Sequence, residues 1–185
     1  MQTNFLLPKI LRTKQIGEEI IRFVCRSHSI LEAVNLRYFN PVGAHMSGEL
    51  GELPVNSPNN LVPVITQTAS GKNSLTVFGN DYPTRDGSCI RDYIHVSDIA
   101  DAHVKAMDWL MNKKNTQQLS VINLGSGNGV SVLEAIASFE KISGIKLHYT
   151  MGPRRQGDVE AVYCDKSYAE RELGWKPKYS LDDMM

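Results

Sequence analysis

The chain has 185 residues, of which 42% are hydrophobic and 22% are charged, a composition typical of one globular domain with a sizeable core. Its 20 basic and 20 acidic residues balance, so no overall positive field attracts nucleic acid, and we expect no nucleic-acid partner. No apolar run reaches membrane-spanning length, and Phe5-Leu6-Leu7 is too short for the core of a signal peptide. We therefore expect no membrane partner either.

The cysteines and histidines indicate neither a disulfide framework nor a metal site. The three cysteines, Cys25, Cys89 and Cys164, are odd in number and widely spaced, which favours free, mostly buried thiols in a reducing compartment. The five histidines never cluster with them at the spacing of metal ligands. The sequence therefore predicts a cytoplasmic protein without a bound metal.

The spacing of apolar residues predicts an amphipathic helix over residues 13–26, with Thr13 as its N-cap, and then a strand over residues 33–38. Residues 41–60 are rich in Gly, Pro, Ser and Asn, and so long a loop inside a compact domain is usually functional. The remaining predicted elements are, in chain order, a helix over 60–68 capped by Asn59 or Asn60, short strands over 75–78 and 92–95, a helix over 97–111, a strand over 119–123, a helix over 131–143, a strand over 146–150, a helix over 166–173 closed by Gly174, and a further helix starting at Ser180. No internal repeat or linker divides the chain, so residues 1–185 are predicted to form a single compact unit.

Six short motifs occur in one order and at close spacing. They are RYFNPVGAH (37–45), PNNLVP (58–63), VFGNDYPTRDG (77–87), CIRDYIHV (89–96), NLGSG (123–127) and RRQGD (154–158). Together they resemble the C-terminal half of the UDP-glucose (UDP-galactose) 4-epimerases, which are extended short-chain dehydrogenases/reductases. The resemblance covers roughly residues 13–175. NLGSG and RDYIHV are shared by many nucleotide-sugar enzymes, whereas the first three motifs are narrower and favour the 4-epimerases.

The resemblance implies an α/β fold, in which the C-terminal part of a Rossmann-type NAD-binding domain is joined to the small α/β substrate-binding domain. Residues 1–40 would be the remnant of the NAD-binding domain, and residues 41–185 mainly the UDP-sugar-binding domain, truncated at both ends. The Gly-rich turn that holds the NAD pyrophosphate at a helix N-terminus in this family has no counterpart in the sequence. Residues 123–129 form another Gly-rich turn between a strand and a helix, but in this family that segment is structural. We therefore expect a chain that begins in the middle of its domain.

The resemblance also implies a reaction. Enzymes of this family transfer the C4 hydride of a UDP-hexose to bound NAD and return it to the opposite face, while a Tyr, four residues before a Lys, removes the O4 proton. The segment Arg12-Thr13-Lys14-Gln15 makes Lys14 the counterpart of that Lys, but Ile10 stands where the Tyr is expected and has no ionisable group. We therefore expect the 185 residues alone to be inactive, and a solvated first-turn lysine is the alternative interpretation of Lys14.

The site residues follow from the same resemblance. Arginine suits a diphosphate, because its planar and permanently charged fork matches phosphate oxygens. The resemblance assigns the cofactor contacts to Lys14, Tyr38 and Phe39, and the substrate contacts to Asn40, Asn60, Leu61, Thr76, Val77, Phe78, Arg91, Arg155, Asp158 and Val162. In that assignment the two arginines hold the diphosphate, Asp158 accepts from the uridine ribose, and the strand over 76–78 pairs with the uracil.

Simpler roles remain open for several of these residues. Asn60 is also a plausible plain helix cap, Arg91 could pair locally with Asp92, and Arg154-Arg155 could be a solvated turn. Asp92, Tyr93 and His95 are expected to orient the neighbouring turn rather than to contact substrate. Val162 matches the position that gates N-acetylated sugars in this family, and its small side chain predicts a roomier pocket there, unless Tyr163 fills the space.

Three functions compete at this point. The first is UDP-glucose 4-epimerase, acting on UDP-glucose and UDP-galactose with NAD in galactose metabolism, with a homodimer formed in part by the helix over 13–26. The second is a non-catalytic UDP-sugar-binding fragment. The third is a related nucleotide-sugar dehydratase or decarboxylase, which RYFNPVGAH and PNNLVP disfavour. The sequence favours 4-epimerase as the family and an inactive fragment as the state of this chain.

Overall fold

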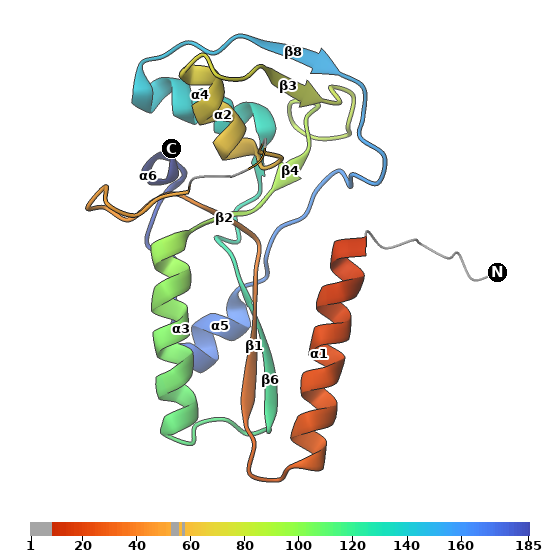
Figure 1. Cartoon of the computed structure of the whole chain (residues 1–185), viewed down its shortest axis with the longest axis vertical. Helices are drawn as coiled ribbons and strands as arrows, with labels where there is room; N and C mark the ends of the chain where they lie inside the picture. The colour runs from red at the N-terminus through yellow and green to blue at the C-terminus, as the bar shows by residue number, and fades with distance from the viewer. Residues whose placement is uncertain (1–8, 53–55, 57) are drawn as a thin grey trace, which may run out of the picture.

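The computed structural model describes residues 9–52, 56 and 58–185. Figure 1 shows two parts stacked along the long axis, and the chain passes from one part to the other several times. The lower part is built around strands β1 and β6, and the upper part around strands β3 and β8. Helices and strands alternate, and the strand pairs are mostly parallel, so the predicted α/β class is confirmed.

The lower part has two parallel strands between helices. Strand β1 (Ala33–Tyr38) pairs with β6 (Leu119–Leu124), and the register runs from Ala33 opposite Leu119 to Tyr38 opposite Leu124. Helix α1 (Lys9–Ser27) lies on one side of this pair, and helix α3 (Val96–Met111) with α5 (Ser167–Leu173) lies on the other (Figure 1). The buried residues that join α3, α5 and the strands are Ile94, Ala102, Ile122, Leu124, Ala169 and Trp175. The bounds of β1 are those that the sequence predicts.

Helix α1 starts earlier than predicted. It begins at Lys9, so Thr13 lies inside the helix and is not its N-cap. Residues 9–12 are all compatible with a helix, and nothing in them breaks the apolar period. The helix is amphipathic, but Ile16, Ile20 and Phe23 remain substantially exposed. An ion pair between Arg37 of β1 and Glu18 joins the helix to the strand. The apolar face of α1 is nevertheless left largely uncovered.

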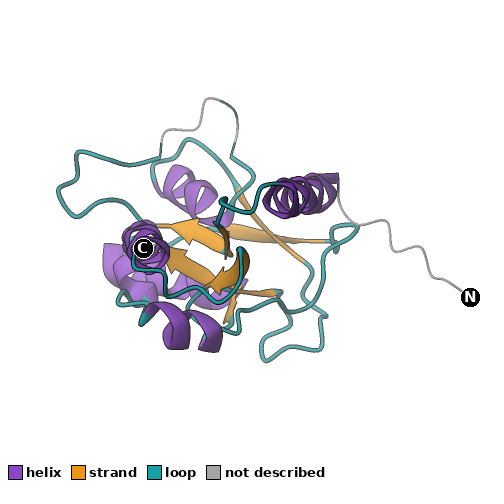
Figure 2. Ribbon diagram, turned by 90° about the horizontal axis from the view of Figure 1, so that it is seen from below, coloured by secondary structure: helices purple, strands orange, loops and turns teal. Residues whose placement is uncertain are grey.

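The upper part is a small two-layer arrangement. Strand β3 (Leu75–Phe78) pairs in parallel with β8 (Tyr149–Gly152), and helices α2 (Leu61–Ala69) and α4 (Val132–Ser143) pack beneath them (Figures 1 and 2). The core of this part consists of Ile65, Leu75, Val77, Ile136, Phe139 and Leu147. Strand β4 (Ile90–Arg91) pairs antiparallel with β7 (Val130–Ser131), and the short helix α6 (Leu181–Met184) packs on α4.

Strand β8 is displaced from its predicted position at 146–150. Helix α4 ends at Gly144, which adopts the left-handed conformation, and the following residues are held by the helix rather than by a strand. The Glu140 carboxylate accepts from the Leu147 backbone amide at 2.8 Å and pairs with Lys146. The ladder therefore starts only at Tyr149, opposite Leu75, and ends where the four-residue partner strand ends.

The two parts meet at a short parallel ladder. Strand β2 (Asn40–Val42) follows β1 after one residue and pairs with β5 (Tyr93–His95), so the start of the predicted loop over 41–60 is a strand. Val42, Tyr93, Ala135 and Met184 form a third buried cluster at this ladder. None of the helices in the described part of the chain is long and apolar enough to cross a membrane.

Candidate functional site

A buried carboxylate organises the ends of the strands. The Asp92 side chain is fully buried and accepts from the backbone amides of Ser126, Gly127 and Cys164 at 2.9–3.0 Å, and from the Ser126 hydroxyl at 2.6 Å. A side chain on Gly125 would meet Asp92 and Cys164, since an added Cβ would lie 2.4–2.5 Å from their atoms. The amides of this Gly-rich turn are therefore taken by Asp92, and the turn offers no cradle for a pyrophosphate.

The turn after β1 is also fixed by Asp92, through its main chain. The backbone and side-chain nitrogens of Asn40 both donate to the Asp92 carbonyl, at 3.1 and 3.0 Å. Phe39 donates from its backbone to Leu124 at the end of β6. The carboxyl ends of two parallel strands therefore meet at this turn, the edge where α/β proteins place their ligands.

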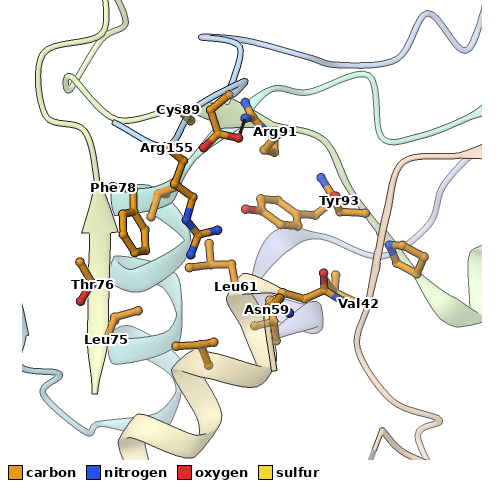
Figure 3. A pocket seen from close by; sticks show the side chains of 17 residues that line it. Val42, Asn59, Leu61, Leu75, Thr76, Phe78, Cys89, Arg91, Tyr93 and Arg155 are labelled. Carbon is orange, nitrogen blue, oxygen red and sulfur yellow. Dashed lines mark hydrogen bonds and ion pairs between the residues drawn. The ribbon is translucent and has the colours of Figure 1, made fainter. Parts of the chain in front are cut away.

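The central feature beyond this turn is a pocket of about 220 Å³ between the two parts. Strands β2 to β5, the start of α2 and the loop after β8 all contribute to it (Figure 3). Eight of the residues that the sequence assigns to the substrate line it, namely Asn40, Asn60, Leu61, Thr76, Phe78, Arg91, Arg155 and Asp158. These residues span 119 positions from Asn40 to Asp158, counting both ends, and only the fold brings them together.

Arg91 is held by three contacts. Its Nη1 donates to the carbonyls of Ile90 and Val159, both at 2.8 Å, and its Nη2 lies 3.3 Å from Asp158 Oδ1 (dashed in Figure 3). The two carbonyl contacts fix the guanidinium, because they come from two adjacent segments, strand β4 and the segment that bridges to Ile90. The predicted local pair between Arg91 and Asp92 does not form, since the carboxylate of Asp92 is used elsewhere.

Arg155 is held differently. Its guanidinium lies over the Phe78 ring, 3.9 Å from the ring centroid, a cation–π contact that orients the charge without using its N–H donors. No acidic side chain in the described ranges forms an ion pair with Arg155. The neighbouring Arg154 turns away and pairs with Asp81. The pocket therefore contains one free guanidinium and one that is paired weakly.

The N-terminus of α2 faces the same pocket. Asn60 occupies the N-cap position, but its side chain makes no capping hydrogen bond. The side chain and the first backbone amides of the helix are therefore available to an anion, which the helix dipole also favours.

Sequence reasoning missed part of the pocket wall. Tyr93 was expected to orient a turn and was not assigned to the pocket, but it lines the pocket and points into it (Figure 3). Burial raises the pKa of its phenol to about 12, so the hydroxyl stays protonated and can donate. Asn59 and Cys89 also line the pocket. No local pattern indicates this position of Tyr93, because all three residues of strand β5 are buried and their burial does not alternate along the strand.

Other predicted residues lie outside this pocket. The Val77 side chain is buried in the upper core, while Val162 is half-exposed beside β4, where its amide donates to the Ile90 carbonyl. Lys14 is exposed on α1, and Tyr38 lies half-exposed at the end of β1. The side chain of Ile10 lies outside the described residues.

Comparison with known proteins places these features in a family. The family model described as GDP-mannose 4,6 dehydratase matches residues 12–185. The chain belongs to this family. The UDP-glucose 4-epimerase of Drosophila melanogaster is 49% identical over 174 residues, which are 94% of this chain and 49% of that protein. The chain thus spans about half the length of the curated relatives it matches.

Solved structures of relatives agree in fold. The UDP-glucose 4-epimerase of Stenotrophomonas maltophila, with bound NAD and formylated UDP-arabinopyranose, is 46% identical and gives a TM-score of 0.89 over 94% of this chain and 51% of that one. The enzyme from Bifidobacterium longum, in complex with NAD+ and UDP, is 46% identical with a TM-score of 0.86 and the same coverage. The resemblance to UDP-glucose 4-epimerases that the motifs indicate is confirmed.

The six motifs fall into two groups according to their place in the structure. RYFNPVGAH, PNNLVP, VFGNDYPTRDG, CIRDYIHV and RRQGD each contribute residues to the pocket, whereas NLGSG wraps around Asp92 beneath it. Five of the six motifs are therefore parts of one cavity, and the sixth supports Asp92, which lies between Arg91 of β4 and Tyr93 of β5.

Proposed function

We propose that this chain forms the nucleotide-sugar-binding part of a UDP-glucose 4-epimerase, which interconverts UDP-galactose and UDP-glucose in cytoplasmic galactose metabolism. The observation that carries the proposal is the pocket itself. Two guanidinium groups and the start of a helix offer sites for a diphosphate. They lie beside the ring of Phe78 and strand β3, one edge of which pairs with no other strand among the described residues. A uracil could pair with that strand edge, while Asp158 accepts from the ribose.

The proposal assigns the recognition of UDP to this chain and the redox chemistry to NAD in the whole protein. NAD accepts a hydride from the sugar and returns it. Lys14, Tyr38 and Phe39 are the residues that we assign to its nicotinamide end. The described residues do not fit the rest of the cofactor, because the amides of the turn at 125–127 are occupied by Asp92. We therefore infer that this chain alone does not hold NAD.

The epimerase proposal is tested by separating binding from turnover. The purified chain should bind UDP in a calorimetric titration, and Arg155→Gln should weaken that binding by about tenfold or more, because it removes an unpaired charge facing the diphosphate. The chain should not convert UDP-galactose with added NAD, since Ile10 stands where a proton acceptor is needed. Turnover that Arg91→Ala abolishes would show that the chain is active by itself.

The alternative functions make different predictions. A non-catalytic UDP-sugar-binding protein would bind UDP with the same residues but would gain no activity in a longer form that carries the Tyr and the Gly-rich turn. A nucleotide-sugar dehydratase, the activity after which the matching family model is named, would release water from its substrate. The sequence is about 50% identical to those of enzymes named as 4-epimerases, and this similarity favours epimerisation.

We also propose that Val162 sets the sugar range of the complete enzyme. Its small side chain is half-exposed, and its backbone is fixed next to the strand that carries Arg91. A longer form should epimerise UDP-N-acetylglucosamine as well as UDP-glucose, and Val162→Tyr should selectively remove the former by steric exclusion. The measurement is the ratio of kcat/KM for the two sugars, with Val159→Tyr as a control. Normal UDP-galactose turnover without any turnover of the N-acetylated sugar would contradict this assignment.

A further inference from the structure

The ion pair between Arg91 and Asp158 is the longest of the three polar contacts that the Arg91 guanidinium makes. At 3.3 Å it is longer than the 2.7–2.9 Å usual for charge-assisted bonds, and it joins single atoms rather than two parallel pairs. The Arg91 carbonyl contacts are shorter, at 2.8 Å. An incoming anion can therefore replace Asp158 on Arg91 without moving the guanidinium.

The position of Asp158 makes that replacement consequential. The residue lies on the same loop as Arg155, three residues later, and both side chains line the pocket. Its carboxylate is about one-third exposed, so it is neither fully solvated nor buried in a network. No other partner for this carboxylate is found among the described residues. Once displaced, it would be an unpaired negative charge next to a bound anion.

We propose that Asp158 is an internal counter-ion, which pairs with Arg91 until a diphosphate takes its place and makes the pocket discriminate against anions that bring no hydroxyl donors. This inference rests on the proposed nucleotide function and adds a residue that sets its specificity. A simple anion such as pyrophosphate must displace Asp158 and then face its charge. A nucleoside diphosphate displaces it too, but its ribose hydroxyls supply donors that the freed carboxylate can accept.

The charge count of the pocket supports this selectivity. Arg91 and Arg155 together carry two positive charges, and Asp158 reduces the sum to one. Removing the carboxylate leaves a more cationic site for any phosphate, but it also removes the acceptor for a sugar hydroxyl. Asp158 therefore lowers the affinity for the bare anion more than it lowers the affinity for the nucleotide.

The test compares two substitutions of the same kind in the full 185-residue chain. Asp158→Asn removes the internal counter-ion. The control, Asp81→Asn, removes the carboxylate that pairs with Arg154 at 2.8 Å outside the pocket, where the Arg154 guanidinium also lies over the Tyr82 ring. Both change the net charge equally. Affinities for pyrophosphate and for UDP are measured by calorimetry at low salt, and thermal unfolding checks that each variant folds. Asp158→Ser serves as a second variant if the amide perturbs the loop.

The expected result is that Asp158→Asn tightens pyrophosphate binding about two- to fivefold, the range for loss of a partly exposed ion pair, while the preference for UDP over pyrophosphate falls. Asp81→Asn should change neither affinity beyond the effect of net charge. The inference would be overturned if both Asp158 variants bound pyrophosphate no more tightly than wild type. It would also be overturned if Asp81→Asn tightened pyrophosphate binding equally, or if no binding were detectable in wild type and variants.

The same titrations distinguish this inference from the proposed function. If wild-type protein prefers UDP strongly and the Asp158 variants do not tighten pyrophosphate, the counter-ion role is wrong and the nucleotide function stands. If wild-type protein prefers UDP no more than pyrophosphate, but Asp158→Asn still tightens pyrophosphate, the counter-ion role stands and the nucleotide function fails.

Discussion

Three buried polar side chains, Asp92, His95 and Asp98, accept hydrogen bonds from backbone amides of nearby loops and helix starts. Asp98 accepts from the amides of Lys178 and Tyr179 at 3.0–3.2 Å, as Asp92 does from the Gly-rich turn. The ring of His95 is fully buried, stacks on Tyr179 at 4.0 Å between centroids, and accepts at Nδ1 from the Ser97 amide. These groups hold loops in place, and His95 is the member that can titrate near neutral pH.

His95 should make the stability of the fold sensitive to mild acid. Burial lowers the pKa of its imidazole below the ordinary value, while the carboxylates of Asp98 and Asp183 oppose this shift without cancelling it. In the unfolded chain the group titrates near pH 6.5, so below about that pH the unfolded state binds a proton that the folded state resists. Its stabilising contribution is therefore complete above the unfolded pKa and is lost as the pH falls through the lower folded pKa.

The measurement is the free energy of unfolding in urea between about pH 7.5 and pH 5 for wild type and His95→Asn. Asparagine can still cap helix α3 through its side-chain oxygen but does not titrate. Wild-type stability should fall more steeply with acid than that of the variant. Parallel curves for the two proteins would show that His95 does not control this dependence.

At the level of single residues, the sequence indicated the chemistry of the pocket better than its geometry. The arginines, Asn60 and Phe78 were predicted from motifs, and the structure brings them together. Tyr93 was expected to orient a turn, and its place in the pocket wall was not predicted, because it depends on the register of β5 against β2, where Tyr93 lies opposite Asn40. Such a pairing across 52 intervening residues leaves no local signal in the sequence.

Two helix starts allow capping and binding to be separated. Helix α4 has a complete capping box, in which Ser131 and Glu134 bond to each other's backbone amides, and Ser131 also bonds to Asp86. Helix α2 has Asn60 at the corresponding position without any side-chain cap bond. Both residues hold the N-cap position, but the third residue of α2 is Pro63, which has no amide N–H for the Asn60 side chain to bond.

We therefore expect opposite outcomes from two alanine substitutions. Ser131→Ala should lower the free energy of unfolding by about 1–2 kcal/mol, since it removes a cap, and should leave UDP affinity within twofold or so. Asn60→Ala should cost well under about 1 kcal/mol but weaken UDP binding clearly. Urea unfolding and calorimetry on both variants give the comparison. Loss of stability in Asn60→Ala as large as in Ser131→Ala would identify Asn60 as a plain cap.

At the level of elements, local patterns predicted what local physics determines. The strands at 33–38 and 75–78 have the predicted ends, and the helix closed by Gly174 has the predicted C-terminal end, because apolar residues and a left-handed glycine mark them. This helix starts one residue later than predicted, at Ser167. The strand at 149–152 was misplaced, because its start depends on side-chain bonds from Glu140 and on a short partner strand. Helix α1 was predicted too short, because a threonine was interpreted as a cap where no break exists.

At the level of the whole molecule, helix α1 carries one of the faces of exposed apolar side chains. Phe23 is 66% exposed, and Ile16 and Ile20 lie on the same helix at helical spacing. Strand β1 pairs only with β6 among the described strands, so its other edge is open. A face of this kind is usually covered by another protein surface. We propose that it contributes to a homodimer in the complete enzyme and drives association of this chain.

Phe23→Lys should shift the purified chain toward monomer in sedimentation velocity experiments, because it places a charge in the centre of that face. Met111→Lys is the matched control, since Met111 is 75% exposed on α3, on the opposite side of the strands. A wild-type chain that is monomeric at every concentration would contradict the proposal, as would equal dissociation by the control.

The repeated crossing of the chain between the two parts has a consequence for how the protein folds. The lower part takes its strands from residues 33–38 and 119–124, and the upper part takes its strands from 75–78 and 149–152, so each part interleaves with the other along the sequence. Neither part can complete its sheet before most of the chain has been synthesised. Pairings so distant in sequence slow folding, because loop closure must precede the contacts that reward it. A ribosome-bound nascent chain would therefore expose its apolar strands until late in synthesis. We expect the need for chaperones to follow from this topology rather than from the size of the protein.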